Sequence, residues 1–195
     1  MSSSSARPCL LFLLFDFYVL SAMAIDVAPL WDFNHPELSE QRFRAALATA
    51  SPEDALILQT QIARTYGLRG DFARAQQALD TIEPQLAAAG AEVRVRYELE
   101  FGRTLASAKH AADSQTPAVK EQARSRYLRA LELAQADQLD VLAIDALHML
   151  AFVDTAPLDQ LKWGEKALAI ALSSSQPAAR QWEASLRNNV GYALH

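Results

Sequence analysis

Signals that begin a helix recur along this chain at short intervals, and they limit the fold more than any other feature. Residues 51–54, Ser-Pro-Glu-Asp, supply a capping serine, proline at the first helical position and acids in the first turn. Thr116-Pro117 supplies a similar start, and Gly70-Asp71 joins a helix-ending glycine to the cap of the next helix. These signals predict helices of roughly 15 to 20 residues joined by short turns. Nothing in the sequence predicts a strand.

The predicted helices fill most of the chain after residue 35. From residue 51 onward the chain is rich in Ala, Leu, Gln, Glu and Arg, which lose least on entering a helix. Pro84 lies inside the third helix and should kink it or end it early. Residues 109–115 form a longer polar connection. The predicted helices are Pro36–Thr49, Pro52–Tyr66, Asp71–Ala89, Glu92–Ala108, Pro117–Ala136, Leu139–Val153, Pro157–Ser173 and Pro177–Leu194.

Residues 1–30 form a separate segment that is signal-like or disordered. Its run from Cys9 to Leu20 is apolar apart from Asp16, and Ala22-x-Ala24 has the small residues expected before a signal-peptidase cut. One interpretation is a cleaved secretory signal, which would place the protein in the periplasm or outside the cell. The other is a non-native extension with Met23 as the true start, and on this interpretation we expect a cytoplasmic protein. The run is too short, and carries a carboxylate, for a stable membrane span.

Small and large residues recur at matching places in the predicted helices. Small residues let paired helices approach closely, and large residues fill the space beside them. A first copy contains Ile62, Ala63, Tyr66, Gly70, Phe72, Ala75 and Leu79; a second contains Phe101, Gly102, Leu105, Ala123, Tyr127 and Ala130; a weaker third contains Leu147, Leu150, Ala151, Trp163 and Ala167; and a fourth begins with Leu186, Asn188, Gly191 and Leu194.

This pattern resembles the tetratricopeptide repeat (TPR), which pairs W-x2-L-G-x2-Y on one helix with A-x3-F on the next. The chain departs from it at Gln59, where the usual aromatic is missing, and in about nine extra residues inside the second copy. The resemblance implies an all-α, right-handed solenoid of antiparallel helix pairs over residues 31–195, with about three and a half repeats. A non-repeating helical bundle, whose apolar stripes look similar, is the alternative.

The last predicted helix has no partner helix after it. Its apolar side, with Trp182, Val190 and Leu194, would be exposed in an array that normally ends in a polar cap. We expect a C-terminally incomplete piece of a longer repeat protein of the bacterial type. Otherwise another molecule covers this helix, and self-association through it is one such case.

The sequence offers no catalytic or cofactor-binding pattern. Its histidines, His35, His110, His148 and His195, lack metal-ligand spacing, and its single cysteine does not accompany them. It also lacks a phosphate-binding glycine loop. The net charge of −5 argues against a general nucleic-acid binder, which needs clustered basic charge. We therefore expect neither enzyme activity, nor a cofactor or metal, nor a nucleic-acid partner.

The resemblance implies that the first helix of each pair lines a concave groove for peptides or partner helices. Guanidinium groups pair with carboxylates and aromatic rings offer contact area, so we expect an acidic or carboxylate-bearing protein or peptide. The alternative is that the arginines pair with neighbouring acids such as Glu98 and Glu100. The candidate groove residues are Arg64, Arg96, Arg103, His148, Phe152, Asn188 and Tyr192, beside Ile57, Thr60 and Leu99 on the same projected face.

The sequence thus predicts an interaction scaffold or adaptor. A second hypothesis is a regulatory repeat region of a larger enzyme or transcription regulator, and a third is a self-associating module. Family members that clamp a terminal carboxylate use lysines that this chain lacks at the matching places, so that specialised function is not carried over.

Overall fold

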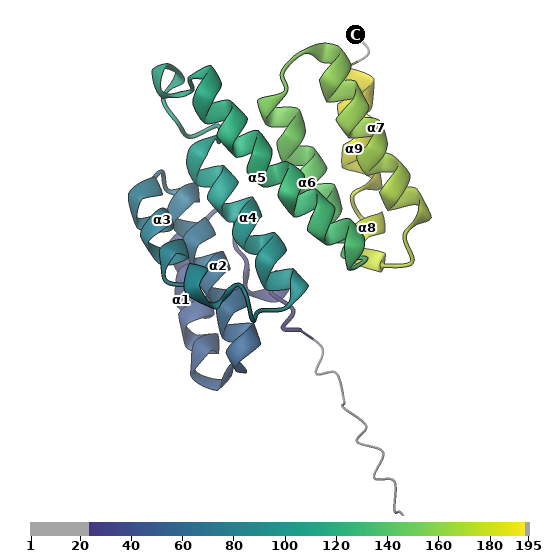
Figure 1. The fold of residues 1–195 in the computed structure, drawn as a ribbon. Coiled ribbons are helices and arrows are strands. Elements are labelled where there is room, and N and C mark those ends of the chain that lie inside the picture. The colour runs from purple at the N-terminus through teal and green to yellow at the C-terminus, as the bar shows by residue number, and fades with distance from the viewer. Residues whose placement is uncertain (1–23, 194–195) are drawn as a thin grey trace, which may run out of the picture.

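The chain is all-helical over residues 24–193, the part that the computed structural model describes (Figure 1). Helices, 3-10 turns and loops account for these residues without a β-strand, which confirms the all-α prediction. The α-helices are α1 (Pro36–Ala46), α2 (Pro52–Leu68), α3 (Phe72–Asp80), α4 (Ala91–Leu105), α5 (Pro117–Ala136), α6 (Asp140–Val153), α7 (Pro157–Ser173), α8 (Pro177–Arg180) and α9 (Glu183–Ala193). The 3-10 turns are η1 (Ala28–Leu30), η2 (Leu47–Thr49), η3 (Glu83–Gln85) and η4 (Ala112–Ser114).

Side-chain caps fix several of the helix starts where the sequence predicts them. The hydroxyl of Ser51 accepts a hydrogen bond from the backbone N–H of Asp54 at 3.1 Å. Thr116 and Asp71 cap α5 and α3 in the same way. These bonds satisfy backbone donors that have no partner inside the helix. Gly70, before the Asp71 cap, has a positive φ of 78°, which glycine adopts without strain.

Two predicted helices are shorter or more broken than expected. The third ends at Asp80, and Pro84 lies in the separate turn η3, because proline has no N–H to continue a helical ladder. The last is split into α8 and α9. There the N–H of Trp182 bonds to the carbonyl of Ala179, three residues back, so the backbone tightens at the junction.

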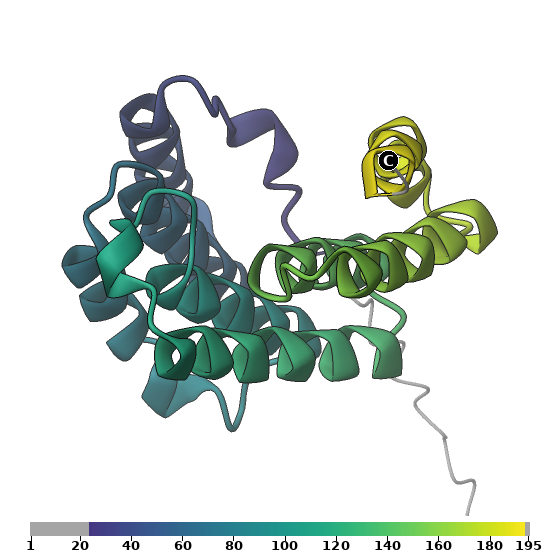
Figure 2. The same cartoon turned by 90° about the horizontal axis from the view of Figure 1, so that it is seen from above.

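Each helix packs chiefly against its neighbours in the chain. The close pairs include α2 with α3, α4 with α5 and α6 with α7, and α5 also packs against α6. Seen from above, the helices follow an open arc (Figure 2). Residues of α2, α4 and α6 line a hollow on its inner side.

The apolar core consists of two clusters that meet at α4. The first extends from Val27 to Tyr97 and the second from Val95 to Leu186. Helix α4 gives Val93 and Tyr97 to the first cluster, and Val95 and Leu99 to the second. Because it presents one side to each cluster, α4 connects the two halves of the molecule.

The N-terminal residues 25–33 lie across the opening of the arc rather than apart from the helices (Figure 2). Val27 is buried, and Ile25, Leu30 and Trp31 pack against the first cluster. Residues 25–30 thus contribute side chains to the first core cluster. The interpretations of residues 1–23 fall outside the described residues. No helix between residues 24 and 193 has both the length and the apolar character needed to cross a membrane.

Candidate functional site

Two hollows lie on the inner side of the arc, and six of the seven candidate residues line them. The larger, of about 760 Å³, is bordered by residues 24–33 and by α2, α4, α6 and α8, and it includes Arg64 and Arg96. The smaller, of about 260 Å³, is bordered by α6, α7 and α9. It includes the other four candidates, His148, Phe152, Asn188 and Tyr192. The seventh candidate, Arg103, is largely buried in an ionic cluster with Arg64.

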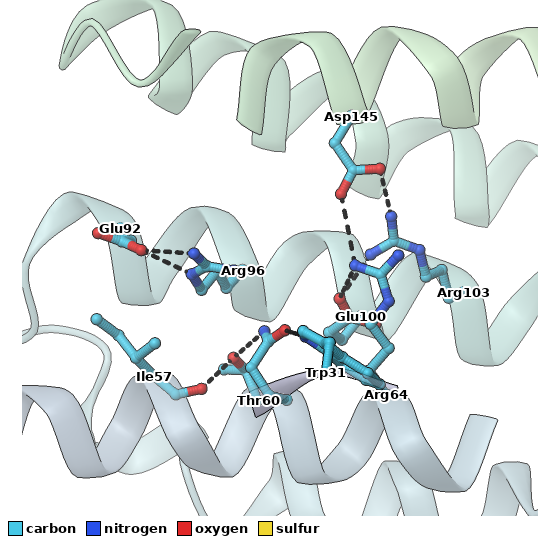
Figure 3. Close-up of polar contacts among 10 residues, drawn as sticks. Trp31, Ile57, Thr60, Arg64, Glu92, Arg96, Glu100, Arg103 and Asp145 are labelled. Atoms are coloured by element: carbon cyan, nitrogen blue, oxygen red, sulfur yellow. Dashed lines mark hydrogen bonds and ion pairs between the residues drawn. The ribbon is translucent and has the colours of Figure 1, made fainter. Parts of the chain in front are cut away.

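That cluster joins three helices through two arginines and two acids (Figure 3). The Arg103 guanidinium donates to the carboxylates of Glu100 and Asp145, each at 2.5 Å. The Nη1 atom of Arg64, on α2, lies 3.7 Å from Oε1 of Glu100 and 3.8 Å from Oδ2 of Asp145. The two positive and two negative charges balance, which is the condition for keeping charges in a low-dielectric site.

Burial and the neighbouring charges move the pKa values of Arg64, Arg103 and Asp145. Burial alone would raise the pKa of Asp145, but Arg103 and Arg64 outweigh it and hold that pKa below its usual value. Burial likewise opposes the charge on Arg103, yet Asp145 and Glu100 raise its pKa. The pKa of Arg64 is lowered by burial and then by repulsion from Arg103. The two arginines therefore favour the ionised form of Asp145.

Arg96 is paired as well. Its Nε and Nη2 lie 2.8 and 2.7 Å from one oxygen of Glu92, one helical turn away on α4. Each of the three candidate arginines therefore has a carboxylate partner inside the chain. Arg103 pairs with both Glu100 and Asp145. The alternative prediction, that arginines pair with neighbouring acids such as Glu100, describes this contact. Because their charges are already paired, these arginines would attract an acidic ligand far more weakly than exposed, unpaired guanidinium groups.

Three residues projected onto the groove face are instead core residues. Ile57 and Thr60 are fully buried and Leu99 is 1% exposed, so the expectation of an accessible position was wrong for them. A chain of hydrogen bonds runs beside them (Figure 3). The Trp31 indole N–H donates to Gln61 Oε1 at 3.1 Å, and Gln61 Nε2 donates to the hydroxyl of Thr60 at 3.0 Å.

The smaller hollow has an uncharged lining at neutral pH. His148 lies between Phe152 and Trp182, with ring centroids 5.2 and 5.8 Å away. Burial lowers the pKa of His148, and the charge of Asp145 opposes this only in part. Its imidazole is therefore neutral at pH 7. The other lining residues are Leu147, Ala151, Phe152, Gln160, Trp163, Gly164, Ala167, Leu186, Asn188, Asn189, Tyr192 and Ala193.

Aromatic side chains stand at the edges of both hollows. Tyr192 is 86% exposed, Phe152 50% and Phe33 58%. Such large exposed rings, clustered on one side of a molecule, are typical of contact surfaces rather than of inert ones. Sequence reasoning identified Phe152 and Tyr192 but missed Trp31 and Phe33, because these lie outside the repeat pattern.

Comparisons of the chain with protein-family models, with curated proteins and with solved structures give no match. Within residues 24–193, no three His, Cys, Asp or Glu side chains are grouped so that they could hold a metal ion. The inner surface presents aromatic rings, amide groups and internally balanced charges.

Proposed function

We propose that this chain is a TPR-like interaction module, a solenoid of antiparallel helix pairs that binds an extended peptide or a partner helix on its inner side. The recurring small and large residues, the packing of each helix on its neighbours and the open arc support this proposal. The smaller hollow carries it, because four candidate residues from two different helices, α6 and α9, line one uncharged depression.

The smaller hollow suits an apolar anchor with polar neighbours. Phe152 and Tyr192 offer exposed ring area, while the side chains of Asn188 and Asn189 present amide donors and acceptors that can pair with a peptide backbone. A ligand of this kind inserts an aliphatic or aromatic side chain and leaves its backbone at the rim. We favour this ligand over an acidic one, because the arginines are paired internally.

A displayed library of random peptides, selected on the full chain, tests the proposal. Isothermal titration then compares a selected peptide on the wild type and on Ala151→Leu, which fills the hollow. We expect at least about a tenfold loss of affinity, equivalent to 1.4 kcal/mol. Ala169→Leu, the same change at an exposed position of α7, is the control and should bind as the wild type does. Peptides that bind Ala151→Leu as tightly as the control would exclude this hollow as the site.

Self-association is a second candidate, favoured by exposed apolar side chains near the C-terminal end. Leu172 on α7 and Tyr192 on α9 are 52% and 86% exposed, and these two helices pack together. Sedimentation velocity over a hundredfold range of concentration tests it. A wild-type dimer that Leu172→Glu and Tyr192→Glu dissociate would support association through this surface, and a concentration-independent monomer would exclude it.

A further inference from the structure

Residues 25–33 contact the inner surface in the manner of a bound peptide. Apart from the single turn η1, the segment makes no regular structure and lies across the opening of the arc (Figure 2). Its backbone is held at one end, where the N–H of Ile25 donates to the Asp54 carboxylate at 2.8 Å. At the other end the N–H of Asp32 donates to the Ser39 hydroxyl at 2.7 Å. Between these ends, side chains make the attachment.

Two aromatic residues form the centre of this attachment. The rings of Trp31 and Phe33 stack with centroids 4.6 Å apart and planes within 2° of parallel. The guanidinium of Arg64 lies 5.6 and 5.5 Å from the two ring centroids, a distance at which a cation attracts an aromatic face. Trp31 also donates to Gln61 and meets the Phe43 ring edge-on at 5.0 Å.

The recognition chemistry does not need a charged ligand. The charge of Arg64 faces the rings on one side and the acids Glu100 and Asp145 on the other, so it is already balanced. The indole N–H needs only the amide oxygen of Gln61. A segment can make these contacts with Arg64 and Gln61 if it has two aromatic side chains separated by one residue. The first of the two must be able to donate a hydrogen bond.

The segment is lightly held compared with the helices. Within it, only Val27 counts as buried, at 9% exposure, while Phe33 is 58% exposed. The larger hollow, of about 760 Å³, lies directly beside it, between the segment and α6. Its detachment breaks two backbone hydrogen bonds and the bond from Trp31 to Gln61, and exposes one buried side chain, Val27. Its covalent tether gives it a high effective concentration when it returns.

We propose that the surface of α1 and α2 beneath residues 25–33 is a second peptide-binding site, which the chain's own segment occupies and from which segments with paired aromatic side chains displace it. This site is separate from the smaller hollow, and its existence does not depend on peptide binding there.

Fluorescence anisotropy with a labelled synthetic peptide of residues 24–35 tests this site in the full chain. The double variant Trp31→Ala, Phe33→Ala leaves the site without its competing rings. We expect it to bind the peptide at least about tenfold more tightly than the wild type, in which the tethered segment competes. A peptide whose tryptophan is replaced by alanine should bind neither protein. Phe152→Ala, Tyr192→Ala removes two aromatic rings from the other hollow and should behave as the wild type does.

A second measurement on the wild type does not depend on whether that variant folds. The N–H groups of Ile25 and Asp32 donate to side chains of α2 and α1, so native-state hydrogen exchange at these two amides reports when the segment detaches. We expect these amides to exchange through a local opening, well before the amides of α2. Exchange of the Ile25 and Asp32 amides together with those of α2, or a folded double variant that does not bind the peptide, would overturn the proposal.

Discussion

The carboxylate of Asp145 on α6 accepts a hydrogen bond from the guanidinium of Arg103 on α4, at 2.5 Å and across 42 residues of sequence. Both helices pack on α5, and this bond joins them directly on the inner side of the arc. Arg64 adds a third helix to the same acid. A single carboxylate thus helps to set the spacing of α2, α4 and α6.

Asp145→Asn should destabilise the protein strongly. The change leaves Arg64 and Arg103 with Glu100 as the one remaining acid of the cluster, and an uncompensated buried charge costs about 3–5 kcal/mol. Urea unfolding followed by circular dichroism measures the loss. Asp80→Asn, the same change at an exposed position, is the control and should alter the free energy of unfolding by no more than about 0.5 kcal/mol. Equal effects of the two changes would show that the cluster adds nothing.

The stabilisation by Asp145 should depend on pH in one direction. Its pKa in the folded protein lies below the ordinary value of 3.8, so its contribution is fully present above that value. It is lost as the pH falls below 3.8 and through the folded pKa, because the folded state must then take up a proton that it binds weakly. The difference in unfolding free energy between the wild type and Asp145→Asn, measured at pH 6 and at pH 3, should shrink in acid. A constant difference would contradict this.

His148 should titrate below its ordinary pKa of 6.5, since burial disfavours its charged form. Its depressed pKa means that the unfolded chain binds the proton better, so this residue costs stability as the pH falls below 6.5. The imidazole chemical shift followed by NMR measures the midpoint. In Asp145→Asn the midpoint should fall further, because the opposing negative charge is removed. A midpoint at or above 6.5 in the wild type would contradict the burial argument.

Gly102→Ala and Gly67→Ala should change stability in opposite directions. A Cβ atom at Gly102 would overlap the ring of Tyr127, which is fully buried and donates through its hydroxyl to the carbonyl of Ala106. That ring cannot yield, so we expect a loss of about 1–3 kcal/mol. Gly67 has open space around it in α2, and alanine there should gain up to about 1 kcal/mol from helix propensity. Thermal melts measure both changes: the melting temperature should fall for Gly102→Ala and rise for Gly67→Ala. A shift of both variants in the same direction would contradict the prediction.

Most of the helices could be predicted because residues at or next to their ends determine where they begin. The helices Pro117–Ala136 and Pro157–Ser173 have the bounds that the sequence predicts, since proline at the first turn fixes where each begins. The break between α8 and α9 carries no comparable signal, because neither glycine nor proline marks it. Local chemistry therefore predicts where a helix starts better than where it is interrupted.

The candidate site was predictable only in part, because contacts between distant helices depend on their register. The spacing of His148 and Phe152 on one helix brings them to the same hollow, as four residues make one turn. The pairing of Arg103 with Asp145 depends on how α4 and α6 lie against α5, which no local pattern specifies. Trp31 was missed for the same reason, since its partner Gln61 belongs to another element.

The division of the core at α4 has a consequence for a chain made on the ribosome. The first cluster needs nothing beyond Phe101 of α4, so it can close as soon as α4 has emerged, while α5 is still being synthesised. Helix α4 is then already packed, and its residues Val95 and Leu99 face the place where the second cluster will form. The remaining helices are then added to this template one after another, each against a helix made shortly before it.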